Sequence, residues 1–217
     1  MRPLDDLVLG LFCTTGLFWV PLYLLRGGSR ATLGAIKQDT LIRFGGLVER
    51  IPLSPNGATL IDLWASVMGA YFIWNQRPEL GAVFFVLAAG FDALDGLLAR
   101  AKHMETERGA VLDFAVDRMS EFLILGAVAV AKLAPPEMCI TALFAGTLIV
   151  FNRVHGKALG IEGFDVTRTP RRELVVVGLL SGYTPEAVGA VALCALLNMS
   201  VELSMLLSRA KGAKKRL

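Results

Sequence analysis

Four aspartates at regular spacing are the residues of this sequence best suited to chemistry. Asp92 and Asp95 are three residues apart, and Asp113 and Asp117 are four residues apart. Within helices, each pair lies on one helix face. All four interrupt apolar stretches, where an ionisable side chain costs at least ~2.5 kcal/mol on insertion scales. Such residues indicate a functional site.

The positions of the two pairs predict that the four carboxylates meet. Their helices are joined by a short loop and must run antiparallel. Asp92 lies eight residues before Arg100 and Asp117 eight after Gly109, so both reach about 12 Å into the protein from the same side. Four clustered carboxylates need a cation to stay ionised, and hard oxygen ligands suit a pair of Mg²⁺ or Mn²⁺ ions. Scattered cysteines and histidines argue against zinc.

The residues beside this cluster suit a phosphorylated ligand. Gly96 and Ala99 leave space for a bulky group to approach the helix backbone, and Arg100 offers a planar fork for phosphate oxygens. Two other classes of protein use membrane carboxylates: an ion or proton transporter, and a scaffold that only binds its ligand. A transport pathway would spread its carboxylates across the membrane, whereas these four are confined to one end.

The composition predicts an all-α integral membrane protein. Of the 217 residues, 54% are hydrophobic and 19% charged, with a mean hydropathy of +0.58, which excludes a disordered chain. The net charge of +3 is too small to indicate nucleic-acid binding, and none is expected. A six-helix transmembrane core is expected at about 57–76, 80–99, 110–131, 138–152, 174–182 and 187–207. The fifth segment is too short to span and is expected to begin earlier, within 168–172.

The chain divides into four predicted parts. An uncharged run at 7–25 predicts an uncleaved hydrophobic helix, and 29–50 places its apolar residues near one helix face, as a helix lying on the membrane does. The predicted parts are an extra N-terminal hydrophobic segment, an interfacial amphipathic helix, the membrane domain and a basic tail, at 1–28, 29–53, 54–209 and 210–217.

Basic residues predict the orientation in the membrane. Eighteen of the 22 Lys and Arg residues fall in four segments, at 26–50, 100–108, 153–172 and 209–217. Because positively charged loops stay on the cytoplasmic side, all four segments and the carboxylate cluster are expected there. The expected location is a multi-pass cell-membrane protein in contact with membrane lipids.

The full aspartate pattern resembles the signature of the CDP-alcohol phosphotransferase family. The matching positions are Asp92-x-x-Asp95-Gly96-x-x-Ala99-Arg100-(x8)-Gly109-x-x-x-Asp113-x-x-x-Asp117. The resemblance implies transfer of a lipid phosphate group from a CDP-linked lipid to an alcohol, with release of CMP. It also implies a homodimer, divalent metal held by Asp92, Asp95, Asp113 and Asp117, and Asp117 as the base.

The resemblance also implies the residues that bind the nucleotide. Arg100 with Gly96 would hold the CDP diphosphate, and Asp92 and Ala99 would also belong to the CDP-lipid site. The segment 54–59 is similar to the family's Pro-Asn-x-x-Thr, which assigns Asn56 and Thr59 to the CDP moiety. Thr106 falls where family members contact the nucleotide.

The acceptor is indicated by the residues after the signature. Residues 117–121 are similar to the Asp-Arg-x-Ser-Asp run of the branch that synthesises phosphatidylinositol phosphate or archaetidylinositol phosphate. Arg153, Arg168 and Arg171 would bind the phosphate of inositol phosphate, although each could serve only as a topology signal. One residue departs from the family pattern: Glu202 stands where the last span often has Gln-Arg. Glycerol phosphate is the alternative acceptor.

Overall fold

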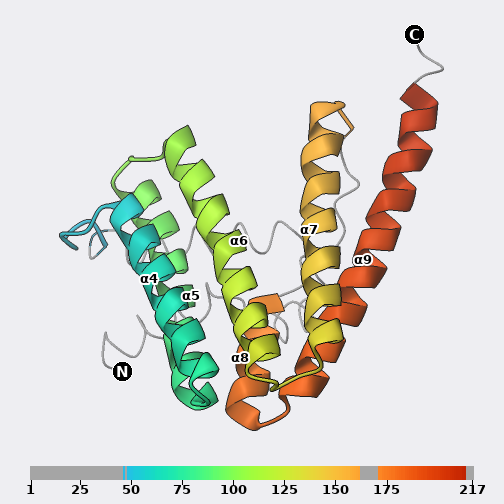
Figure 1. Cartoon of the computed structure of the whole chain (residues 1–217). Helices are drawn as coiled ribbons and strands as arrows, with labels where there is room; N and C mark the ends of the chain where they lie inside the picture. The colour runs from blue at the N-terminus through green and yellow to red at the C-terminus, as the bar shows by residue number, and fades with distance from the viewer. Residues whose placement is uncertain (1–45, 47, 162–170, 214–217) are drawn as a thin grey trace, which may run out of the picture. The chain divides into compact units, whose positions relative to one another are not determined.

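The part of the chain that the structure describes is helical throughout. The computed structural model describes residues 46, 48–161 and 171–213. These residues form α4 (Pro55–Trp74), α5 (Pro78–Ala101), α6 (Glu107–Val130), α7 (Pro136–Ala158), α8 (Arg171–Ser181) and α9 (Thr184–Ala213) (Figure 1). The predicted N-terminal hydrophobic segment, most of the predicted interfacial helix, and residues 214–217 of the basic tail lie outside the described residues.

Proline and hydroxyl residues set the starts of the helices. Pro55, Pro78 and Pro136 each occupy the first turn of a helix, where a missing N–H breaks no hydrogen bond. The Ser54 side chain caps α4 by accepting a hydrogen bond from Gly57 N at 3.1 Å. Thr106 Oγ1 accepts a hydrogen bond from Gly109 N at 3.0 Å in the first turn of α6. These local signals fix where α4, α5, α6 and α7 begin.

In the first of two compact units, which runs to Ile124, α4 packs against α5. Glycines allow the two backbones to approach. A Cβ atom on Gly81 would lie 2.8 Å from the carbonyl oxygen of Gly69 and 2.4 Å from Ile73 Cγ1. Small residues at such contacts are common between membrane helices. The packing brings the start of α4 beside the end of α5.

A lysine holds the segment before α4 in place. Lys102 Nζ donates to the carbonyl oxygens of Ile51 at 2.7 Å and Leu53 at 2.9 Å. Ile51 and Leu53 also pack against a cluster of buried apolar residues, namely Val48, Ala58, Leu97, Leu98 and Ala101. The cluster positions the entry to α4 against the end of α5.

In the second unit, which begins at Leu125, α9 packs against both α7 and α8. Ala145 and Ile149 of α7 form a small buried cluster with Ala195 of α9. Between α8 and α9 the chain turns tightly at Gly182, whose φ of 78° lies in the left-handed region that glycine adopts without strain.

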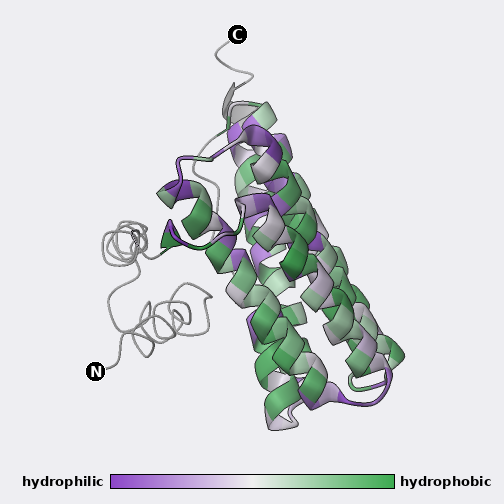
Figure 2. Cartoon of the chain, turned by 90° about the vertical axis from the view of Figure 1, so that its left-hand side faces the viewer, coloured by the Kyte–Doolittle hydropathy of each residue, from purple (hydrophilic) through white to green (hydrophobic). Residues whose placement is uncertain are grey.

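Four of the helices are long and apolar enough to cross a membrane: α4, α5, α7 and residues 184–209 of α9. Apolar residues run along much of their length (Figure 2). Large apolar side chains such as Trp64, Phe144 and Leu193 are more than half exposed, as expected for surfaces that face lipid. The predicted all-α class is confirmed for the described residues. The expected six-span core is not confirmed. α8 has only 11 residues, and α6 is not among the helices that are long and apolar enough to cross a membrane.

Candidate active site

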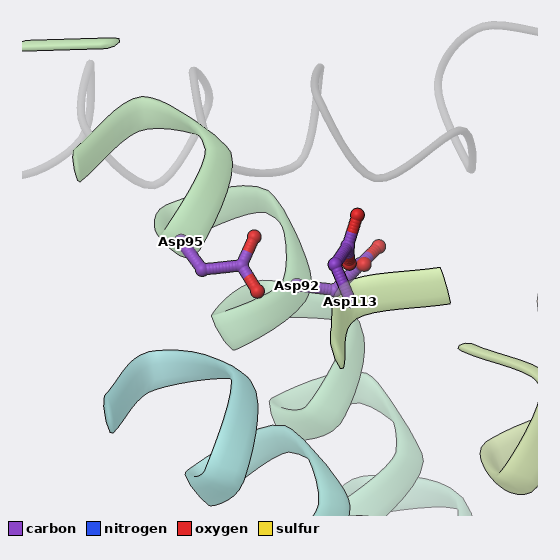
Figure 3. Close-up of side chains that lie close together, drawn as sticks. All are labelled: Asp92, Asp95 and Asp113. Atoms are coloured by element: carbon purple, nitrogen blue, oxygen red, sulfur yellow. The ribbon is translucent and has the colours of Figure 1, made fainter. Parts of the chain in front are cut away.

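Three of the four predicted aspartates lie together. Asp92 and Asp95 are on α5 and Asp113 is on α6, and one carboxylate oxygen from each lies within 4.8 Å of the others (Figure 3). Asp95 is buried, Asp92 is half-buried and Asp113 is exposed. The group therefore runs from the interior to the surface, so a ligand can reach it from one side.

This group has the chemistry of a site for a hard divalent cation. Its donors are carboxylate oxygens on two helices, and no histidine or cysteine belongs to it. Mg²⁺ and Mn²⁺ are typically bound by such ligands. Three close carboxylates also repel one another, and a bound cation would relieve that repulsion. The donor set fits the ions expected from the sequence.

A threonine of α4 fixes one carboxylate of the group. Thr59 Oγ1 donates to Asp95 Oδ2 at 2.6 Å and also lies 3.2 Å from the carbonyl oxygen of Pro55. Thr59 is only 3% exposed. The contact of this hydroxyl with the nucleotide, which the resemblance implies, stays a prediction, and the structure adds its hydrogen bond to Asp95. Thr59 thus orients a member of the aspartate group.

The fourth aspartate is not part of the group of three. Asp117 Oδ2 accepts a hydrogen bond from Arg118 Nη2 at 2.6 Å, and the same guanidinium pairs with the buried carboxylate of Glu121. Arg118 thus joins two carboxylates on one side of α6. Sequence reasoning used Arg118 only as part of a family pattern and missed this role.

Of the residues predicted to bind the CDP-lipid, Arg100 and Gly96 lie next to each other on α5. The guanidinium of Arg100 lies over Gly96, where an added Cβ atom would be 3.4 Å from Nη2. Arg100 Nε is buried and has no hydrogen-bond partner among the described residues. A buried donor without a partner is costly and suits an anionic ligand. Ala99 is half-buried beside it in the same turn.

The starts of α4 and α6 also meet near these residues. A Cβ atom on Gly109 would lie 3.1 Å from Thr106 Oγ1 and 3.3 Å from Asn56 Oδ1. Asn56 and Thr106 are both exposed. The two residues predicted to contact the nucleotide from different segments therefore both lie close to one glycine, where a larger side chain would make tight contacts.

A buried chain of polar side chains between α4 and α6 was missed by sequence reasoning. Ser66 Oγ is hydrogen-bonded to Ser120 Oγ at 2.7 Å and donates to Asp62 Oδ1 at 3.3 Å. All three residues are almost fully buried. The sequence does contain a signal for this chain of hydrogen bonds, namely hydroxyl and carboxylate residues within apolar helices. Such groups need hydrogen-bond partners when they are buried.

The predicted acceptor residues belong to the second unit, apart from Arg168, which lies outside the described residues. Arg171 is the first residue of α8 and is half-buried. Arg153 of α7 forms an ion pair with Glu202 of α9, with 2.6 Å between Nη2 and Oε1. The sequence marked Glu202 only as a departure from a family pattern, and its pairing with Arg153 was missed.

Fold and site together define a helical membrane protein with a group of carboxylates and, on the same helix as two of them, a half-buried arginine. The chain belongs to the CDP-alcohol phosphatidyltransferase family, whose model matches residues 53–207. It is therefore an integral membrane transferase of phosphate-containing groups in phospholipid biosynthesis.

Its relatives include synthases of inositol-containing lipids. An archaetidylinositol phosphate synthase of Pyrococcus horikoshii is 26% identical over 182 residues, which cover 84% of this chain and 94% of that protein. A phosphatidylinositol phosphate synthase of Mycobacterium marinum is 33% identical over 139 residues, covering 59% of this chain and 58% of that protein.

Solved structures with the same fold belong to phosphatidylinositol phosphate synthase of Mycobacterium tuberculosis. The structure with CDP-DAG bound has a TM-score of 0.65 and 21% identity, and the match covers 76% of this chain and 92% of that one. The structure in complex with manganese and citrate has a TM-score of 0.64 and 22% identity, with 76% and 88% covered.

Proposed function

We propose that this protein transfers the phosphatidyl or archaetidyl group of a CDP-linked lipid to inositol phosphate and releases CMP. The observation that carries the proposal is the aspartate group of α5 and α6, with the guanidinium of Arg100 lying over Gly96, the residue that follows Asp95 in α5. The names of the relatives support inositol phosphate as the acceptor in preference to glycerol phosphate.

Asp92, Asp95 and Asp113 would hold the divalent cation, and Asp117 would complete a two-ion site. Bound Mg²⁺ or Mn²⁺ would neutralise charge on the diphosphate and on the departing CMP. Thr59 contributes by keeping the Asp95 carboxylate in one orientation through its 2.6 Å hydrogen bond.

On the donor side, the residues around Gly96 and Gly109 would bind the CDP group. Arg100 would donate to diphosphate oxygens, and Gly96 and Ala99 would let the diphosphate approach α5. Asn56 and Thr106 would contact the rest of the nucleotide from the starts of α4 and α6. Arg100 Nε supports this assignment, because it is buried and finds no hydrogen-bond partner in the part of the chain that the structure describes.

In the reaction, a hydroxyl oxygen of the acceptor would form a bond to the lipid-side phosphorus. The bond from that phosphorus to the oxygen of CMP breaks, and Asp117 takes the hydroxyl proton. Arg153, Arg168 and Arg171 would bind the acceptor's own phosphate. The proposal also includes three features of the whole protein. The active site lies on the cytoplasmic side, residues 54–209 contain six membrane spans, and the protein is a homodimer.

A comparison of acceptors tests this function. Purified protein would be mixed with CDP-lipid and Mn²⁺, and CMP release would be followed with inositol phosphate, glycerol phosphate and free inositol. We expect inositol phosphate to give the highest kcat/KM, because charge-assisted contacts to its phosphate add to binding. If free inositol gave the highest kcat/KM, the proposal that arginines bind a phosphate of the acceptor would be wrong. An ion transporter or scaffold would release no CMP with any acceptor.

Replacing Arg100 by alanine tests the donor side. We expect the KM for CDP-lipid to rise roughly ten- to a hundredfold, because a charge-assisted hydrogen bond to phosphate is lost. The KM for inositol phosphate should change little. Arg77→Ala, at the exposed start of the same helix, is the control and should leave both constants unchanged. A rise confined to the acceptor KM would reverse the assignment.

A further inference from the structure

An ion pair joins α7 to α9 within two helices that are apolar enough to cross a membrane. Arg153 Nε lies 3.1 Å from Oε1 and 3.3 Å from Oε2 of Glu202, and Nη2 lies 2.6 Å from Oε1. The contacts use one edge of the guanidinium and both carboxylate oxygens. A pairing of this kind fixes the plane of the guanidinium and not only its position.

The two members of the pair differ in access to ligand. The Arg153 side chain is 25% exposed, whereas the Glu202 side chain is 0% exposed. Arg153 can therefore reach a molecule at the surface, whereas Glu202 has no exposed surface of its own and can act on such a molecule through Arg153.

Stability alone does not explain this pair. Removing two charges from water costs several kcal/mol per ion, and well-packed apolar residues in place of a buried pair often give equal or greater stability. A buried acid in a membrane helix that binds an arginine at the surface is more typical of a functional arrangement. Glu202 also balances the charge of Arg153, which lowers the cost of holding a partly buried arginine between two apolar helices.

We propose that Glu202 is a positioning residue that orients Arg153 for the phosphate of the acceptor. The proposal rests on the proposed function, in which Arg153 binds that phosphate. Glu202 holds the guanidinium by one edge, and the fixed plane lowers the entropy lost when phosphate binds. The residue that departs from the family pattern is thereby part of acceptor recognition.

The first test is Glu202→Gln, which keeps the shape of the side chain and removes its charge. We expect the KM for inositol phosphate to rise roughly tenfold, because a charge-assisted contact that orders Arg153 is weakened. The KM for CDP-lipid should change little, whereas the Tm in detergent should fall, because a buried ion pair loses one of its charges. Ser204→Ala, an exposed residue of the same helix, is the matched control and should leave all three unchanged. An unchanged acceptor KM in Glu202→Gln would overturn the proposal, and so would a lower one, because Glu202 would then compete with the acceptor.

A charge exchange separates positioning from structural support. The double variant Arg153→Glu with Glu202→Arg restores an ion pair between α7 and α9 but moves the guanidinium to the other helix. If Glu202 positions Arg153, the KM of the double variant for inositol phosphate should stay high even if its Tm returns to the wild-type value. Recovery of the acceptor KM together with the Tm would show that the pair only supports the fold, and the proposal would be wrong.

Binding of inorganic phosphate distinguishes failure of this proposal from failure of the proposed function. If the wild-type protein released no CMP with inositol phosphate, the proposed function would fail. Calorimetric titration of phosphate into wild type and Glu202→Gln would then still measure the role of Glu202. Weaker binding by the variant supports positioning, and equal binding contradicts it.

Discussion

Replacing Asp113 by asparagine is expected to lower the rate of CMP release by roughly a thousandfold or more. Asp113 supplies one of the three carboxylate oxygens that lie within 4.8 Å of one another. An amide in its place removes a negative charge and a ligand from the group, and with them the electrostatic support for the reacting phosphorus. Because Asp113 is exposed, the change should leave the helices folded.

The measurement is CMP release at saturating CDP-lipid and inositol phosphate, with the Tm in detergent as a check of folding. Glu79→Gln is the matched control, since Glu79 is an exposed carboxylate in the first turn of α5, far along the helix from Asp92. It should retain the wild-type rate. Near-normal turnover in Asp113→Asn would refute the assignment of the aspartate group.

Removal of divalent ions should abolish CMP release altogether, and Mg²⁺ or Mn²⁺ should restore it. The carboxylates of Asp92, Asp95 and Asp113 repel one another and the diphosphate of the donor, so without a cation the donor cannot approach. The protein would be treated with EDTA, exchanged into metal-free buffer and assayed before and after each ion is added. Binding of Mn²⁺ to the same sample, followed by electron paramagnetic resonance, provides a readout independent of activity.

The metal assignment would be wrong if the chelated protein kept its full rate. It would also be wrong if Asp95→Asn bound Mn²⁺ as tightly as wild type. Thr59→Val provides an intermediate case, because it keeps every carboxylate but removes the hydrogen bond to Asp95. Loss of a residue that orients a metal ligand typically costs 10- to 100-fold in affinity or activity, so about that loss is expected.

Spacing along single helices was the most informative part of the sequence. Intervals of three and four residues place side chains on one face, and the short loop between α5 and α6 forces two such faces together. That is why Asp92, Asp95 and Asp113 could be expected near one another before the fold was known. The bounds of the helices were less accurate. The fourth expected span, at 138–152, lies within α7, which continues to Ala158 because no proline or glycine turn stops it earlier.

Contacts between helices distant in sequence could not be predicted in the same way. Thr59 and Asp95 are 36 residues apart, and their hydrogen bond depends on how α4 packs against α5. Arg153 and Glu202 are 49 residues apart, on α7 and α9. A family pattern suggested roles for Thr59 and Arg153 but not these partners. The partners depend on side-chain packing that no local rule specifies.

The most direct test of the proposed reaction is its stoichiometry. Inositol phosphate labelled with ³²P would be mixed with purified protein, CDP-lipid and Mn²⁺, and the label extracted into lipid would be compared with the CMP released. Transfer to inositol phosphate predicts one labelled lipid for each CMP, because the acceptor keeps its own phosphate. CMP released without labelled lipid would indicate hydrolysis or another acceptor and would contradict the proposed function.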